Sequence, residues 1–238
     1  MTRTRLSRAA MALIVSLPAA AARAQTPAAG RAFIDVNAGV AVESGAIETS
    51  RSFSLFGETG AVATRVTPPS GALVDARIGT RVGRRIGFAV AVSGGRSEAE
   101  GRATASVPSP IRFASPSIVA LDAPGLKRRE IGYHVQALWF MPVGQHLSVA
   151  VFGGPSVIRL QQAIAGIAVD SSTPVITATN ESGTALGANG GLDVAYWLHA
   201  RYGVGFFARY AAGSVNLPSA SSVKVGGFQG GGGLRLRF

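Results

Sequence analysis

The three histidines of this sequence are the first candidates for a catalytic base. His134 lies in the run Tyr133-His134-Val135-Gln136, so that Gln136 occupies the position where a His-x-Ser pair would need its serine. His146 does have Ser148 at that spacing, and His199 has no serine nearby on its C-terminal side. A histidine activates a hydroxyl only when the two groups are within hydrogen-bond reach. The chemistry open to His146 therefore depends on where the fold places it.

No other residue pattern predicts a cofactor or metal site. The chain has no Cys, and its His, Asp and Glu residues do not cluster at metal-ligand spacing. The glycine run at residues 230–233 precedes no helix, so it is not a phosphate-binding loop. The chain is basic, with 23 Lys and Arg against 12 Asp and Glu, but the excess is spread along the sequence rather than clustered. We therefore expect no cofactor, no metal and no nucleic-acid partner.

Charged residues that recur on one side of a period-two pattern form the main candidate site. Carboxylates and guanidinium groups on the buried face of a sheet must pair, since an unpaired buried charge costs several kcal/mol. The pattern predicts a charge network made of Asp35, Asp75, Arg77, Arg81, Glu130, Asp193, Arg209, Arg235 and Arg237. Counting outward from the turn near Arg201 places Asp193 opposite Arg209. Asp35 is expected near Arg235 or Arg237.

The elements that position these charges are strands. Apolar and polar residues alternate in eight segments, at residues 32–42, 72–82, 86–93, 129–140, 147–156, 186–196, 203–210 and 223–238. The connections alternate strictly between long and short. In an up-and-down barrel this order puts all long loops at one end and all short turns at the other. The sequence thus predicts an all-β fold, an eight-stranded antiparallel up-and-down barrel.

The long connections have different characters. Residues 42–70 are predicted to form a hairpin that extends beyond the sheet. Residues 94–127 are predicted to be a polar insertion whose four prolines break any extended ladder, and residues 160–183 to be another loop. Apolar residues in the first two connections, which either pack together as a cap or form an adhesive surface, are Phe53, Leu55, Phe56, Ile111, Phe113, Ile118, Val119 and Leu121.

The apolar face of the strands can point outward to lipid or, as in a soluble lipocalin-like barrel, inward. Charges are almost absent from that face, and the polar face is rich in glycine, which suits a crowded lumen. The apolar face also carries aromatic residues near the short turns, as an interfacial belt requires: Trp139, Tyr196, Tyr202 and Phe238. We therefore predict a transmembrane barrel.

The first residues have the pattern of a secretory signal peptide. Arg3, Arg5 and Arg8 precede an apolar run at residues 9–22, and Ala22-Arg23-Ala24 is a small-x-small cleavage site. We expect a helical signal peptide at residues 1–24, a disordered lead-in at 25–31 and the barrel at 32–238. An apolar run of this length is too short for a spanning helix.

The end of the sequence resembles the C-terminal assembly signal of bacterial outer-membrane barrels. Gly233, Leu236 and Phe238 fit that signal, whereas Gly231 stands where a polar residue is usual. With the signal peptide and eight strands, the chain resembles the small outer-membrane β-barrel proteins, the group of the outer membrane protein A barrel and its X- and W-type relatives. The resemblance implies the bacterial outer membrane, contact with its lipid, insertion by the barrel assembly machinery and a monomeric barrel.

The resemblance also frames the function. Lipid A deacylases of this membrane carry a His-x-Ser pair at the membrane-facing rim, but His134 lacks the serine and His146 lies at the short-turn rim, so we expect no enzyme. The prediction is a structural or surface-interaction barrel with a filled, salt-bridged lumen and an extracellular partner bound through the long loops. The alternatives are a narrow porin-like channel for ions or small solutes and, after it, a soluble periplasmic ligand-binding barrel or a lipid-modifying enzyme.

Overall fold

The computed structural model describes residues 31–43, 47–67, 70–109, 111–113, 115–170, 173–220 and 222–238. The predicted signal peptide, residues 1–24, and all but Arg31 of the predicted lead-in lie outside the described residues. Within the described ranges, no helix is long and apolar enough to cross a membrane.

The described chain forms ten strands joined in one sheet. They are β1 (Ala32–Glu43), β2 (Ile47–Leu55), β3 (Glu58–Thr67), β4 (Gly71–Val82), β5 (Ile86–Val107), β6 (Ser117–Pro142), β7 (Leu147–Asp170), β8 (Thr173–Trp197), β9 (Tyr202–Val215) and β10 (Val223–Arg237). Every pairing between them is antiparallel.

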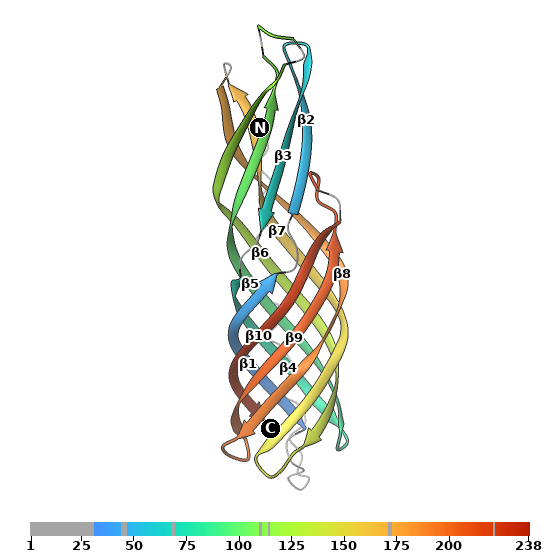
Figure 1. Cartoon of the computed structure of the whole chain (residues 1–238). Helices are drawn as coiled ribbons and strands as arrows, with labels where there is room; N and C mark the ends of the chain where they lie inside the picture. The colour runs from blue at the N-terminus through green and yellow to red at the C-terminus, as the bar shows by residue number, and fades with distance from the viewer. Residues whose placement is uncertain are drawn as a thin grey trace, which may run out of the picture.

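Eight of these strands close into a ring. The order is β5-β4-β1-β10-β9-β8-β7-β6, and the pairing of β6 with β5 completes the circle (Figure 1). The predicted eight-stranded antiparallel barrel is therefore confirmed. Its seam joins β1 to β10, with Phe33 opposite Arg237 and Glu43 opposite Gly227.

Side chains along the ring strands alternate between the interior and the outer wall. In β4, for example, Leu73, Asp75 and Arg77 are buried, whereas Val74, Ala76 and Ile78 are exposed. The same parity holds in the other ring strands, so the apolar face points outward and the polar face points inward, as predicted. A soluble barrel with an apolar interior would have the opposite arrangement.

The short and long connections lie at opposite ends of the barrel (Figure 1). The turns after β4, β6 and β8 gather at the lower end in this view, where the C-terminal residue also lies. At the upper end β5, β6, β7 and β8 continue far beyond the ring.

Two of the predicted loops are wrong, because strands occupy most of their length. β5 and β6 remain paired up to Val107 and Ser117, and β7 and β8 remain paired up to Asp170 and Thr173. The prolines do not interrupt the β5–β6 ladder. Pro124 lies at the register shift between Ala99 and Gly101, where β6 has one residue more than β5 and forms a bulge, and Pro108 and Pro116 lie beyond the paired residues.

The hairpin predicted at residues 42–70 is confirmed as β2 and β3. Phe56 and Gly57 at its tip both have positive φ, 52° and 78°, as a two-residue type I′ turn requires. Above the ring, β3 replaces β4 as the partner of β5: β4 pairs with β5 up to Arg96, and β3 pairs with it from Glu100 to Ser106.

Candidate functional site: the filled lumen

The predicted charge network lies inside the barrel, divided among separate levels. Seven of its nine residues are buried, namely Asp35, Asp75, Arg77, Glu130, Asp193, Arg209 and Arg235. Arg81 and Arg237 are only half-buried, near the short-turn end.

A four-charge ring, which we call the quartet, consists of Asp35, Arg77, Asp193 and Arg235. Arg77 places Nη2 2.6 Å from Asp35 Oδ2 and 2.9 Å from Asp193 Oδ2. Arg235 places Nη2 2.8 Å from Asp193 Oδ2, and its Nε lies 3.7 Å from Asp35 Oδ1. Each arginine thus contacts both carboxylates. The quartet carries no net charge, so its members neutralise one another in a place where water cannot.

A second level lies one step further from the short turns. Arg209 Nη1 is 2.9 Å from Asp75 Oδ2, and Arg209 Nε donates to Gln229 Oε1 at 2.8 Å. Asn37 links the two levels, because its Nδ2 donates to Asp75 Oδ1 at 3.2 Å and its Oδ1 accepts from Arg235 Nη1 at 2.6 Å.

A third level pairs Glu130 with Arg128, a residue that the sequence analysis missed. Arg128 is 1 % exposed and contacts Glu130 directly, while Glu130 also accepts from the backbone amide of Gly226 at 3.1 Å. Arg128 was missed because the predicted strand began at Arg129, which left its neighbour in a loop. If the inward and outward alternation of the predicted strand is continued by one residue, Arg128 lies inside the barrel.

The predicted pairing of Asp193 with Arg209 is wrong. Asp193 lies opposite Phe207, and Arg209 lies opposite Gly191. The β8–β9 turn closes with Trp197 opposite Gly203, so its centre is at residue 200, one residue before the assumed one. An error of one residue in the centre of a hairpin shifts every cross-strand partner by two. The other pairing was Asp35 with Arg235 or Arg237, and Asp35 lies opposite Arg235.

Aromatic rings fill the short-turn end of the lumen. Phe33 and Phe140 meet edge to face with centroids 5.9 Å apart. The Arg81 guanidinium carbon lies 4.0 Å from the Phe140 ring centroid, and that of Arg237 lies 4.1 Å from the Trp197 ring centroid. Arg81 and Arg237 therefore contact rings rather than the quartet. The cavity between these rings and the quartet measures only about 20 Å³, which leaves room for about one water molecule.

A polar cluster, also missed, surrounds His134. Its Nε2 is hydrogen-bonded to Ser93 Oγ at 3.0 Å and its Nδ1 to Ser156 Oγ at 2.8 Å. Asn189 donates to the same Ser156 hydroxyl at 3.0 Å and accepts from Gln136 Nε2 at 3.0 Å. Each of these hydroxyls comes from a strand next to that of His134, so no spacing along the chain reveals the contact.

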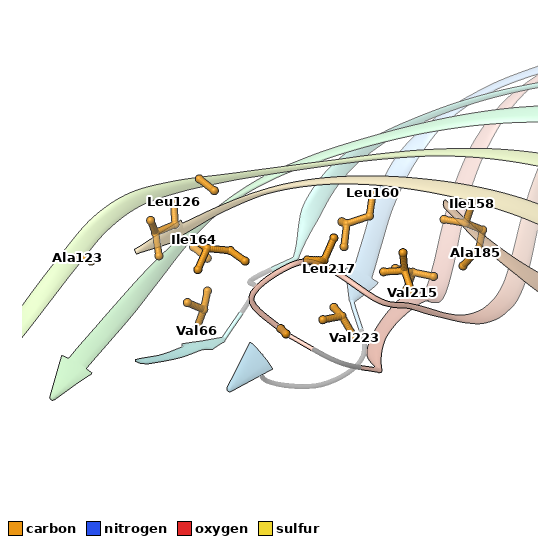
Figure 2. Packing of buried hydrophobic residues seen from close by; sticks show 14 of the residues in the cluster. Val66, Ala123, Leu126, Ile158, Leu160, Ile164, Ala185, Val215, Leu217 and Val223 are labelled. Atoms are coloured by element: carbon orange, nitrogen blue, oxygen red, sulfur yellow. The ribbon is translucent and has the colours of Figure 1, made fainter. Parts of the chain in front are cut away.

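An apolar cluster closes the end of the lumen away from the short turns (Figure 2). Leu160, Val215 and Val225 come from ring strands, Val66 comes from β3, and Leu217 comes from the β9–β10 connection. Figure 2 shows Leu217 among the strand residues Leu160, Val215 and Val223. The β9–β10 connection thus folds inward over the barrel.

The lumen is filled from end to end.

No protein-family model and no curated protein sequence matches the chain. Among solved structures, it is similar to three small bacterial surface and outer-membrane proteins. Neisserial surface protein A shows 13 % identity over 87 % of this chain and 97 % of that one, with a TM-score of 0.48. Outer membrane protein OprG from Pseudomonas aeruginosa shows 10 % identity over 88 % and 96 %, with a TM-score of 0.49. Ail, the attachment invasion locus protein of Yersinia pestis, shows 14 % identity over 87 % and 99 %, with a TM-score of 0.36.

The residues predicted for the aromatic belt lie on the outer wall. Trp139, Tyr196, Tyr202 and Phe238 are all about half exposed or more, and all lie beside the short turns. Of the predicted assembly-signal residues, Leu236 faces outward like Phe238, and Gly233 lies on the seam. Among the described residues, no three His, Asp or Glu side chains come together in a way that could hold a metal ion.

The apolar cluster that closes the lumen contains none of the apolar residues predicted on the long connections whose side chains are described, and the side chain of Leu121 lies outside the described part of the structure. Ile111, Phe113 and Ile118, at the tip of the β5–β6 hairpin, are more than three-quarters exposed. Phe53 instead packs against the backbone of β3, since a Cβ added at Gly60 would meet its ring. The apolar cluster around Leu217 closes the lumen without them.

Proposed function

We propose that this chain is an integral barrel of the bacterial outer membrane, of structural or surface-interaction type, with a lumen that does not conduct. The observation that carries the proposal is the contrast between the outer wall and the interior. The lower outer wall carries apolar side chains, whereas the interior carries charges that neutralise one another.

A hydrocarbon environment accounts for the outer wall. In β5, the outward residues Ile86, Phe88, Val90 and Val92 are each between 42 % and 53 % exposed, and the neighbouring strands repeat this pattern. Monomeric soluble proteins rarely expose apolar patches of such extent. A closed barrel satisfies every backbone group within its own ladder, which is the condition for strands to cross a lipid bilayer. Insertion by the barrel assembly machinery as a monomer is part of the proposal.

The filled lumen supports a structural role over a channel. Ions would have to pass the Phe33–Phe140 contact, the quartet and the apolar cluster around Leu217, and each of these is packed. Breaking the quartet to admit an ion would leave buried charges unpaired, at a cost of several kcal/mol. The barrel therefore serves as a stable anchor for the hairpins above it.

The exposed tip of the β5–β6 hairpin is where we place the interaction with an extracellular partner. Ile111, Phe113 and Ile118 present apolar surface far from the apolar outer wall. Large exposed apolar groups of this kind mark contact sites for other molecules.

Two measurements test this function. In the first, the protein is extracted from outer-membrane fractions in mild detergent and run on SDS gels with and without boiling. We expect a compact unboiled band that shifts on heating. Recovery from the soluble periplasm without a shift would contradict the membrane location.

In the second, the folded protein is placed in planar bilayers, where we expect no steady conductance. Steady single-channel currents whose ion preference changes when Arg77 and Arg209 are replaced would overturn the closed lumen and favour a narrow channel.

The proposed interaction is tested by measuring how cells that carry the barrel bind to a surface. One set of cells carries the intact barrel, and the other carries a barrel in which a short Gly-Ser turn replaces residues 108–116. The shortened barrel should lose binding while it keeps its heat shift on gels. Unchanged binding would exclude this tip as the contact.

A further inference from the structure

Arginine side chains gather on the outer wall immediately beyond the apolar surface. Arg96 on β5 and Arg129 on β6 are directly opposite one another. Arg159 on β7 lies opposite Ile131, which is the next outward residue of β6. All three arginines are exposed. They come from three adjacent strands and together form what we call the arginine row.

The arginine row has no protein partner of opposite charge. Like charges directly opposite in a sheet are destabilising, yet within the described part of the chain no ion pair involves Arg96, Arg129 or Arg159. The nearest carboxylate along the ladder, Glu98, lies opposite Lys127 and so does not reduce the positive charge of the patch. An external anion would relieve this repulsion.

A groove runs along the arginine row and extends below it, towards the short turns. Across β4, β5 and β6, Val74, Gly94 and Ile131 are consecutive partners, so Gly94 leaves a gap between two aliphatic side chains. A Cβ at Gly94 would meet only Val74 Cγ2, at 3.6 Å. The groove has a volume of about 790 Å³, and beyond Arg129 its lining includes Lys127, Gln161, Ser182 and the buried Arg128 and Glu181.

The groove has an apolar part and a charged part, which lie in the same order as the acyl chains and the headgroups of a bilayer. It therefore matches an amphiphile. Gly94, Val74 and Ile131 belong to the apolar wall, where an acyl chain lies, and the arginines stand at the level of the headgroups. Arginine binds phosphate oxygens through two parallel N–H donors. Gln161 and Ser182, which pair across β7 and β8, extend the row with polar groups that suit sugar hydroxyls.

We propose that this groove is a binding site for a phosphorylated glycolipid of the outer leaflet, of the lipopolysaccharide class. Arg96 and Arg129 hold a headgroup phosphate, Arg159 adds charge at the edge of the apolar wall, and one acyl chain lies over Gly94. The inference rests on the outer-membrane location proposed above.

The test uses the full chain folded in a neutral detergent, with purified lipopolysaccharide as probe and the amount retained after size-exclusion chromatography as readout. The charge variant is Arg96→Gln with Arg129→Gln, and its matched control is Arg84→Gln with Arg85→Gln in the exposed turn at the other end. The groove variant is Gly94→Leu, and its control is Gly230→Leu, another outward glycine, at which an added Cβ would meet nothing closer than 3.7 Å.

We expect the charge variant to retain at least ten-fold less lipopolysaccharide, the groove variant to lose several-fold, and both controls to match the unaltered protein. Phosphatidylglycerol, offered as a second probe, should be retained weakly, and phosphatidylcholine not at all. Equal retention by the charge variant overturns the site. Phosphatidylglycerol bound as well as lipopolysaccharide overturns the glycolipid assignment.

The gel shift on heating, measured for each variant, separates this inference from the proposed function. A protein that shifts but binds no lipopolysaccharide overturns the lipid site and leaves the membrane barrel intact. A protein that never shifts overturns the membrane barrel itself.

Discussion

Arg235 has the most polar partners of any arginine in the quartet, since it binds Asp193 through two nitrogens, lies beside Asp35 and donates to Asn37. Its side chain is almost completely buried. Replacing it removes one cation from a neutral set and leaves a net negative charge in the interior. The cost of such a change comes mainly from the unpaired charge that remains, and less from the hydrogen bonds that are removed.

We predict that Arg235→Leu lowers the free energy of unfolding by about 3–5 kcal/mol. The measurement is urea unfolding in detergent micelles, with the heat-dependent gel shift as the readout. Arg84→Leu, in an exposed turn, serves as control and should change little. The double variant Arg235→Leu with Asp193→Leu should be more stable than Arg235→Leu alone, because it removes one charge of each sign. An additive loss in the double variant would show that the quartet is not a unit.

The seam between β1 and β10 depends on a residue without a side chain. A Cβ at Gly233 would overlap the carbonyl oxygen of Val36 on the neighbouring strand, whereas at Gly230 it would meet nothing closer than 3.7 Å. We predict that Gly233→Ala destabilises the barrel by about 1–3 kcal/mol through overpacking, and that Gly230→Ala is close to neutral. The fraction of compact band on unboiled gels measures both. Equal behaviour of the two would mean that close strand approach does not limit the seam.

At the scale of elements, the sequence predicted β1, β4 and β10 over nearly their whole length, but only the lower part of β5, β6, β7 and β8. Between Ile86 and Ser93 one face is exposed and the other is packed, so large apolar residues alternate with small ones. Above Gly94 the outer face carries Arg96, Glu98 and Glu100 in place of large apolar residues, while the inward residues, such as Ala99, remain small. The outer face is then no longer the more apolar one, and this part of the strand has the amino-acid composition of a loop. Pairing with the adjacent strand, which composition does not report, is what keeps this region extended.

The candidate site was predictable only in part, for a related reason. Parity placed Asp35, Arg77, Asp193 and Arg235 inside, because parity needs only the strand itself. Their partners depend on register, and register depends on the centre of each turn. The arginine row illustrates the same limit on the outer wall: its members are far apart in the sequence, and the charge excess looked dispersed until β5, β6 and β7 were aligned.

The β2–β3 hairpin is an extension that the ring does not need. β1 and β4 pair with each other up to Ala41 and Gly71, so a short turn can join them directly. We predict that a variant in which residues 44–69 are replaced by Asn-Gly keeps its heat shift and loses less than about 2 kcal/mol, since only Val66 leaves the apolar cluster. Urea unfolding of this variant provides the measurement. Failure to form a compact band would show that β3 is required to complete the barrel.

For the whole molecule, the stability cost of an added charge depends on where that charge lies relative to the apolar outer wall. Val90 lies mid-height on the outer wall between Ile78 and Val135, and Ser214 lies on the outer side of β9 near its upper end. We predict that Val90→Arg costs about 2–4 kcal/mol, as at the middle of a bilayer, whereas Ser214→Arg costs about 0–1 kcal/mol. Unfolding in phospholipid vesicles measures the difference. The same cost at both positions would contradict a bilayer around the lower barrel.

The position of the seam has a consequence for the timing of assembly. The other pairings of the ring join strands that follow one another along the chain, or nearly so, whereas the seam joins residues 33–43 to residues 227–237. Phe238 N donates to Ala32 O at 2.9 Å, so one short peptide could link them. A circular permutant linked there and opened in the turn between β4 and β5 would have the same ring but would close it elsewhere. Which two strands meet last is therefore set by where the chain is opened, and not by the strand pairs of the finished ring.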